Sequence, residues 1–219
     1  MTPTQERRIQ EQLDTREKIL AAAREMFAHE GYDAVTMRAI AKRIGYTPTA
    51  IYHHFKNKSA LLTELCDQDF ARLAQHFNAS VATADPVERI LAVGQAYLRF
   101  AELYPSQYRF MFMTVIPFTE LSGEYLAEHR GIPERDAYAF LRAACQEAID
   151  RGAFVAEIQD ADELAQILWG GVHGFISIRI TKGHEQWVPW RDAHDVAIRG
   201  MQMMLRGILR DPSKIPLDR

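Results

Sequence analysis

The chain has 219 residues, of which 47% are hydrophobic and 25% are charged, which is the composition of an ordinary globular protein. This composition excludes a disordered or fibrous chain, and no stretch reaches the ~20 uncharged apolar residues that a membrane span needs. The net charge of −3 conceals an uneven distribution, because residues 1–60 hold ten Lys and Arg against seven Asp and Glu while the remainder is acidic.

Apolar residues recur with helical spacing almost throughout, and no alternating strand pattern is found, so we expect an all-α fold. The first helix is predicted to begin after Asp14, as its N-cap, and to end at Gly31. Two short helices are predicted after Thr36 and Thr47. Longer helices follow at about residues 59–77, 86–104, 108–116, 134–151, 161–181 and 190–210, with a loop or broken helix at 117–133. We expect a small domain of three helices at residues 1–62 and a larger helical domain at 63–219.

Two other features bear on the setting of the protein. The polar residues 1–13 lack the apolar core of a signal peptide, so we expect a cytoplasmic protein that does not associate with a membrane. Cys66 and Cys145 form no CxxC pair and are expected to be buried free thiols.

The segment that ends at Phe55 has the features of a helix-turn-helix. Thr36 is placed to cap a short helix, and Gly45 supplies a turn that needs a positive φ angle. Thr47 is placed to cap the next helix, whose first position holds Pro48, where no backbone donor is lost. Two short helices joined in this way are typical of a motif that places its second helix in the major groove of DNA.

The second of these helices is predicted to have two different faces. Ile51 and Phe55 lie one turn apart and face inward, whereas Thr49, Tyr52 and His53 share an outward face. The surrounding window, residues 34–63, contains no acidic residue and five basic ones: Arg38, Lys42, Arg43, Lys56 and Lys58. A local basic surface on an acidic chain suits a phosphate backbone, although a solvated surface without a partner has the same composition.

This pattern resembles the N-terminal signature of TetR-type regulators over roughly residues 15–65. The residues that carry the resemblance are Tyr32, Thr36, Ile40, Ala41, Gly45, Thr47, Ile51, Tyr52, His54, Phe55, Lys58 and Leu61. The resemblance implies phosphate contacts from Thr36, Tyr52, His54 and Lys58. It implies contacts with base edges from Thr47, Pro48, Thr49 and His53. Tyr46 replaces the valine that is commonest in the family and would bring an extra phenol near the phosphates.

Upstream of this motif, Arg7 and Arg8 lie in the segment predicted to precede the first helix. They form either an arm that enters the minor groove or an inert tail. The adjacent His53 and His54 point about 100° apart on a helix and so make a poor metal site. We expect no metal and no cofactor.

Aromatic and methionine side chains are unusually frequent between residues 85 and 118. They fill a solid core or line an apolar cavity, and TetR-type regulators generally carry an effector pocket in this part of the chain. We therefore expect a pocket for a small, largely apolar effector, lined by Tyr97, Phe100, Tyr104, Phe112, Trp169 and His173. His173 is either a satisfied core histidine or a polar contact for the ligand. Residues 108–112 and 169–174 also resemble the C-terminal subclass named for its Trp-His-Gly motif.

The last two helices are predicted to form a homodimer interface. Gly170, Gly171 and Gly174 are costly inside a helix, and their expected use is to let another backbone approach closely. The final helix is apolar at Val196, Met201, Met204, Leu205 and Ile208. A twofold axis would convert this helix pair into a four-helix seam.

Together these patterns predict a dimeric repressor that binds a palindromic, double-stranded DNA operator and is released by an effector. An alternative is an architectural DNA-binding protein without an effector, whose larger domain serves only oligomerisation. An enzyme is disfavoured because the sequence holds no nucleophile–base arrangement, metal-ligand spacing or phosphate loop.

Overall fold

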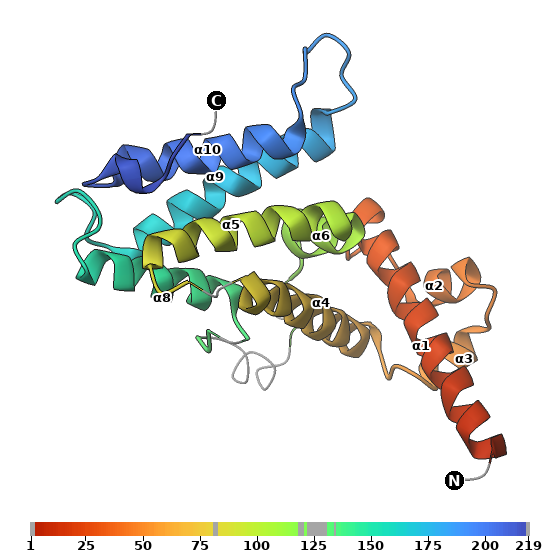
Figure 1. Cartoon of the computed structure of the whole chain (residues 1–219). Coiled ribbons are helices and arrows are strands. Elements are labelled where there is room, and N and C mark those ends of the chain that lie inside the picture. The colour runs from red at the N-terminus through yellow and green to blue at the C-terminus, as the bar shows by residue number, and fades with distance from the viewer. Residues whose placement is uncertain (1–2, 81–82, 118–120, 122–130, 134, 218–219) are drawn as a thin grey trace. The chain divides into compact units, whose positions relative to one another are not determined.

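A computed structural model describes residues 3–80, 83–117, 121, 131–133 and 135–217. Within these ranges the chain forms nine α-helices and a short 3-10 helix, and it forms no β-strand (Figure 1). An isolated antiparallel bridge joins Phe154 and Leu209. The predicted all-α fold is confirmed, whereas most of the predicted loop at 117–133 lies outside the described residues.

The chain divides into two compact units. The first comprises Met1–Asp69 and Tyr104–Glu128, and the second comprises Phe70–Leu103 and His129–Arg219. The helix α4 (Lys58–Ser80) contributes to both units.

In the first unit, α1 (Pro3–Glu30), α2 (Met37–Arg43), α3 (Pro48–Tyr52) and the first turns of α4 surround a small core, which α6 (Pro105–Met113) also covers. The Phe27 ring in α1 lies 6.1 Å from the Phe110 ring in α6, centroid to centroid. The largest fully buried side chains of this core include Ile19, Phe27, Ile40, Ile51, Leu61 and Phe110. The core therefore fixes α3 from beneath, since a five-residue helix is not stable alone.

The prediction that the first helix begins after Asp14 is wrong, because α1 already begins at Pro3. Residues 3–14 contain no glycine and suit a helix, and their side chains pair one turn apart. Arg7 Nε lies 2.8 Å from Glu11 Oε1, and the Gln10 amide donates to Asp14 Oδ1 over 2.8 Å. Asp14 is therefore an interior residue of the helix, and Arg7 and Arg8 belong to a helix rather than to a tail.

The second unit contains α5 (Pro86–Leu103), α8 (Ala137–Asp150), α9 (Ala161–Lys182), α10 (Ala193–Ile208) and the 3-10 helix Pro212–Lys214. α8 and α10 both pack against α9, and α5 packs against all three. Aspartates at the caps begin α8, α9 and α10, and Asp192 accepts from the Asp195 amide over 3.0 Å. That cap explains why the last helix begins at Ala193 and not near Trp190.

Both cysteines are free and buried, as predicted. Burial raises the pKa of the Cys66 thiol to about 12, with Asp69 and Asp67 adding to the effect, and burial alone raises the pKa of Cys145 to about 12. Because the thiolate is the reactive and metal-binding form, burial keeps both cysteines in the less reactive thiol form at neutral pH. None of the described helices is long and apolar enough to span a membrane.

Candidate nucleic-acid interface

The turn between α2 and α3 is built from the local signals that the sequence contains. The Thr36 hydroxyl accepts a hydrogen bond from the Ala39 amide over 3.1 Å, and Thr47 accepts from the Ala50 amide over 3.3 Å. Gly45 has a φ angle of +74°, which an L side chain rarely adopts. Both caps and the turn agree with the predictions, so the two helices begin where the sequence indicates, whereas α3 ends at Tyr52, before the predicted members His53 and Phe55.

α3 presents one face to the core and the other to solvent. The Ile51 side chain is fully buried and Phe55, just after the helix, is 3% exposed. Thr49 and His53 are exposed, and Tyr52 is 50% exposed. The predicted division of this helix into an inward and an outward face is therefore confirmed. The outward face is exposed and can enter a DNA groove.

The other predicted contact residues surround this face. Thr36, Tyr46, Thr47 and Pro48 are exposed, and His54 is partly buried. Burial, the positive charge of Arg16 and the neighbouring His53 lower the pKa of His54. Its imidazole is therefore neutral at neutral pH and offers a phosphate an N–H donor, not a charge.

Arg16 in α1 holds the end of α3 in place. Its guanidinium donates to the His54 carbonyl over 2.8 Å, forms two hydrogen bonds to the Glu64 carboxylate in α4, and lies 4.2 Å from the centre of the Phe55 ring. Three segments of the chain thus meet at one side chain. Arg16 was not identified from the sequence, because a lone arginine before an apolar helical stripe gives no signal of its partners.

Lys58, for which a phosphate contact is predicted, makes contacts within the chain that give it a structural role. Its ammonium donates to the Tyr32 carbonyl over 2.8 Å and to the Val35 carbonyl over 3.0 Å, and lies 4.0 Å from the centre of the Tyr32 ring. These contacts join the start of α4 to the loop before α2. An ammonium has three N–H donors, so one remains for a phosphate.

In the second unit, three of the predicted effector residues form a hydrogen-bonded group. The Trp169 indole N–H donates to the Tyr97 hydroxyl over 3.1 Å, and that hydroxyl lies 3.4 Å from His173 Nδ1. Tyr97 is buried, Trp169 is 39% exposed, and His173 is half-buried. Burial lowers the pKa of His173, so the imidazole is neutral at neutral pH. The group offers polar contacts in an otherwise apolar setting.

The remaining predicted effector residues are Phe100, Tyr104 and Phe112. Phe100 is fully buried, and its ring makes an edge contact with the His76 ring at 5.9 Å. Tyr104 and Phe112 belong to the first unit, where the Phe112 ring lies 5.2 Å from the Tyr108 ring.

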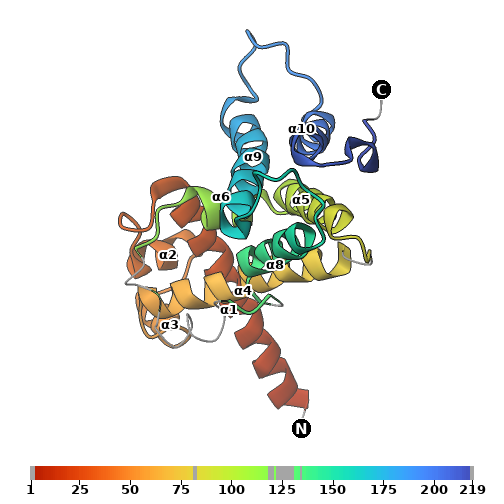
Figure 2. The same ribbon diagram turned by 90° about the vertical axis from the view of Figure 1, so that its left-hand side faces the viewer.

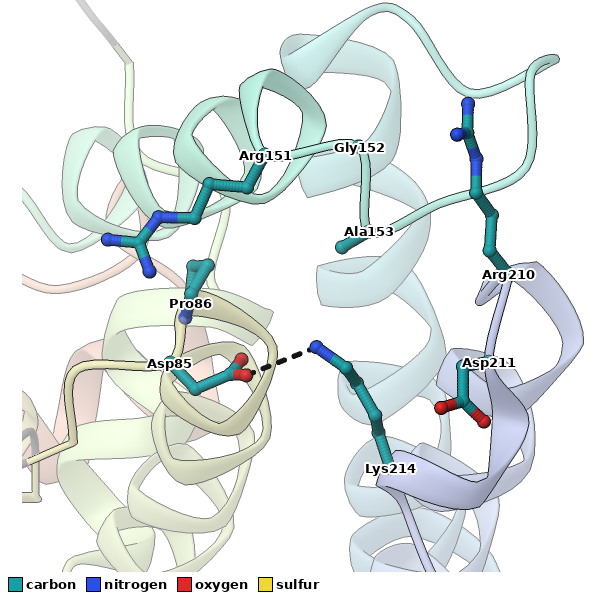
Figure 3. A pocket seen from close by; sticks show the side chains of 8 residues that line it. All are labelled: Asp85, Pro86, Arg151, Gly152, Ala153, Arg210, Asp211 and Lys214. Carbon is teal, nitrogen blue, oxygen red and sulfur yellow. Dashed lines mark hydrogen bonds and ion pairs between the residues drawn. The ribbon is translucent and has the colours of Figure 1, made fainter.

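A cavity of about 330 Å³ opens elsewhere in the second unit, and none of the predicted effector residues lines it. Figure 3 shows its mixed charges. The Lys214 ammonium lies 3.4 Å from Asp85 Oδ2, Arg151 donates to the Ala84 carbonyl over 3.2 Å, and Arg210 donates to the Phe154 carbonyl over 2.7 Å. Each of these cations is engaged by the chain itself, and the cavity does not resemble an apolar pocket.

Both parts of the sequence match known families. Residues 19–65 match the family described as "Bacterial regulatory proteins, tetR family", and residues 90–204 match the one described as "Tetracyclin repressor-like, C-terminal domain". The HTH-type transcriptional regulator UidR of Escherichia coli (strain K12) is 38% identical over 76 residues, which cover 35% of this chain and 36% of UidR. The chain thus matches about a third of the length of that relative.

Other similarities extend over the whole chain. The HTH-type transcriptional repressor BepR of Brucella suis biovar 1 (strain 1330) is 28% identical over 217 residues, which cover 94% of this chain and 97% of BepR. The crystal structure of the TetR family regulator PfmR from Thermus thermophilus has a TM-score of 0.67 at 24% identity, covering 90% of this chain and 98% of PfmR. SmeT, the repressor of the Stenotrophomonas maltophilia efflux pump SmeDEF, has a TM-score of 0.61 at 23% identity, covering 92% of this chain and 95% of SmeT. Because two capped helices, a glycine turn and both family matches coincide, this chain belongs to the TetR family of DNA-binding transcriptional regulators and not to a class of enzymes.

Proposed function

We propose that this protein is a repressor that binds a palindromic operator as a homodimer and leaves it when a small, largely apolar effector binds. The observation that carries the proposal is the outward face of α3, where Thr49, Tyr52 and His53 are exposed within a window free of carboxylates. Repression is supported by the names of two similar proteins, BepR and SmeT, which are both repressors.

Within this interface we assign two kinds of contact. Contacts with base edges are assigned to Thr47, Pro48, Thr49 and His53. Contacts with the phosphate backbone are assigned to Thr36, Tyr46, Tyr52, His54 and Lys58. Only the first kind carries sequence information, because phosphates are the same at every base pair.

Replacing Thr49 or His53 should change the operator sequence that the protein prefers. Thr49→Ala and His53→Ala remove exposed side chains, so the fold is expected to stay intact, and each lost base contact changes discrimination by about 1–3 kcal/mol. The measurement is selection of bound sequences from randomised DNA. Tyr52→Phe is the matched control, since loss of a phosphate contact weakens binding to all sequences and leaves the consensus unchanged. Identical consensus sequences for wild type and both alanine variants would contradict the assignment.

The proposed dimer interface is an exposed apolar stripe on α9 and α10. On α9, Ile167, Gly170, Gly174 and Ile178 follow each other at helical spacing. On α10, Val196, Met203 and Gly207 do the same, whereas Met201 and Leu205, which the sequence also placed at this interface, are buried within the chain. All residues of the stripe except the half-buried Gly174 are exposed, and a Cβ added at Gly170, Gly174 or Gly207 would meet no atom within 4 Å. Figures 1 and 2 show the two helices side by side. An apolar surface of this kind is typical of a contact with another protein, and a twofold axis would pair it with itself.

The proposed effector site is built around Tyr97, Trp169 and His173. Polar groups within an apolar surrounding orient small ligands, and these three side chains are already linked by hydrogen bonds. Release from DNA then requires that the effector prefer a conformation in which the two copies of α3 no longer match the spacing of the operator half-sites.

Two finer assignments complete the proposal. We place DNA binding in residues 1–62, and effector binding and dimerisation in residues 63–219. On the segments 108–112 and 169–174 we also place the C-terminal part in the Trp-His-Gly subclass.

Binding of an effector should change Trp169 fluorescence and weaken operator binding together. The chain has three tryptophans, and the double substitution Trp187→Phe with Trp190→Phe leaves only Trp169. The emission of this variant therefore reports on the contact between Trp169 and Tyr97. A panel of small apolar compounds is screened by emission and thermal shift, and compounds that stabilise the fold are tested for operator release. A compound at about 100 times its Kd raises stability by roughly 2.7 kcal/mol. Compounds that shift emission and stability but leave operator binding unchanged would contradict induction.

A further inference from the structure

The N-terminal turns of α1 extend beyond the helix-turn-helix that they precede. Figures 1 and 2 show them projecting past α2 and α3, and residues 5–14 are all exposed. Nothing in the core of the first unit requires these turns, since the buried residues of α1 begin at Ile19. The function assigned above leaves this part of the chain without a role.

The two sides of these turns differ in charge. Arg8, Gln12 and Arg16 follow one another at intervals of four residues and therefore share a face. The nearby carboxylates lie at least roughly 100° around the helix from Gln12, and these are Glu6, Glu11, Asp14 and Glu17. Glu11 lies roughly 60° from Arg8, but its carboxylate pairs with Arg7, so this face holds guanidinium and amide donors beside a carboxylate that is already engaged.

This donor face lies on the side of α1 that meets α3. Arg16 is its last member, and its guanidinium bonds to the His54 carbonyl just after α3. Arg8 lies two turns further, ~12 Å along the helix axis, which corresponds to about three to four base pairs of duplex. A duplex that contacts α3 therefore runs within reach of Arg8 and Gln12.

The adjacent residues Arg7 and Arg8 differ in their ion pairing. Arg7 points about 100° away from Arg8 around the helix, and its guanidinium forms an ion pair with Glu11 at 2.8 Å. Within the described part of the chain Arg8 forms no ion pair, and its charge is exposed to solvent. A positive charge without an internal partner is suited to a phosphate, because binding then releases a counterion without breaking an ion pair.

We propose that the N-terminal turns of α1 form a second DNA-contacting element, in which Arg8 and Gln12 bind phosphates that flank the site read by α3. The contact is to the backbone and lengthens the bound segment of duplex without adding base specificity. The proposal rests on the proposed operator binding by α3.

The test compares two pairs of variants, and within each pair the same charge change is made on and off the face that holds Arg8 and Gln12. For each subunit of the dimer, Arg8→Gln should weaken operator binding roughly three- to fivefold and lower the slope of log affinity against log salt by about 0.9, which is about 1.8 for the two subunits together, whereas Arg7→Gln leaves the slope within error. Gln12→Glu, which places a negative charge on the donor face, should weaken binding more than Gln10→Glu does. All four side chains are exposed, and circular dichroism verifies that the helix is retained.

The outcomes separate this proposal from operator binding itself. If the wild type binds the selected operator and both members of each pair behave alike, the extension does not contact DNA and the proposal is wrong. If Thr49→Ala and His53→Ala leave sequence preference unchanged, the assignment of α3 fails independently of Arg8. The effect of Arg8→Gln should also disappear on operators shortened by a few flanking base pairs, because the flanking phosphates are then absent. An effect of the same size on the short and the long operator would overturn the proposal.

Discussion

Met203→Glu should convert the dimer to a monomer and remove operator binding at concentrations where the wild type is bound. Met203 is 60% exposed in the single chain and lies within the proposed stripe on α10, so the twofold contact would bury it in both copies. A carboxylate left buried without a partner costs about 3–5 kcal/mol, and the dimer would bury two of them, so its Kd rises by at least roughly 100- to 5000-fold. Operator binding falls with it, because each monomer reaches only one half-site.

Sedimentation equilibrium and operator titration measure the two effects on one preparation. Leu103→Glu is the matched control, since Leu103 is a 58% exposed apolar residue at the end of α5, outside the stripe. The same change of charge there should leave the dimer intact. If Met203→Glu remains a dimer and binds DNA normally, the interface lies elsewhere on the chain.

The helix-turn-helix was predictable in detail because its signals are local. A threonine three residues before an amide that needs a partner, or a glycine where φ must be positive, determines a cap or a turn from within a few residues. Thr36, Gly45 and Thr47 follow these rules, and the structure places each of them as predicted. The inward and outward faces of α3 follow from helical spacing for the same reason.

The start of α1 was missed because the sequence offers two acceptable beginnings. Asp14 and Glu17 have the spacing of a capping box, yet the residues before them also favour a helix and pair through Arg7 and Glu11. A cap signal does not end a helix that is able to continue upstream. The preference is decided by several small contacts, each worth only a few tenths of a kcal/mol.

Long-range partners could not be predicted from one sequence. Arg16 and Lys58 bond to backbone carbonyls 38, 26 and 23 residues away.

The three glycines of α9 were predicted to share one role, but they divide into two groups. A Cβ at Gly171 would collide with the Met204 sulfur in α10, while Gly170 and Gly174 are open. Only the packing of α9 against α10 distinguishes them.

The buried ion pair between Arg24 and Asp69 is a further long-range contact, and it joins α1 to α4 in the first unit. Arg24 Nε lies 2.7 Å from Asp69 Oδ2, and Arg24 Nη2 donates to Asp69 Oδ1 over 2.8 Å. The Asp69 side chain is 1% exposed and the Arg24 side chain is 12% exposed. This is the most buried of the ion pairs among the described residues. Its two parallel hydrogen bonds join charged groups and are therefore strong.

Asp69→Ala should therefore lower the free energy of unfolding by about 3–5 kcal/mol, because it leaves the Arg24 guanidinium buried without its counter-charge. That loss is a large part of the roughly 5–15 kcal/mol by which a domain is stable. Urea denaturation measures it, and Glu11→Ala is the control, since removal of an exposed pair costs about 0.2–1 kcal/mol. The double variant Arg24→Met with Asp69→Leu should recover most of the loss, because apolar side chains of similar volume replace both charges at little cost. If Asp69→Ala costs no more than Glu11→Ala, the pair is open to water in solution and does not hold α1 against α4.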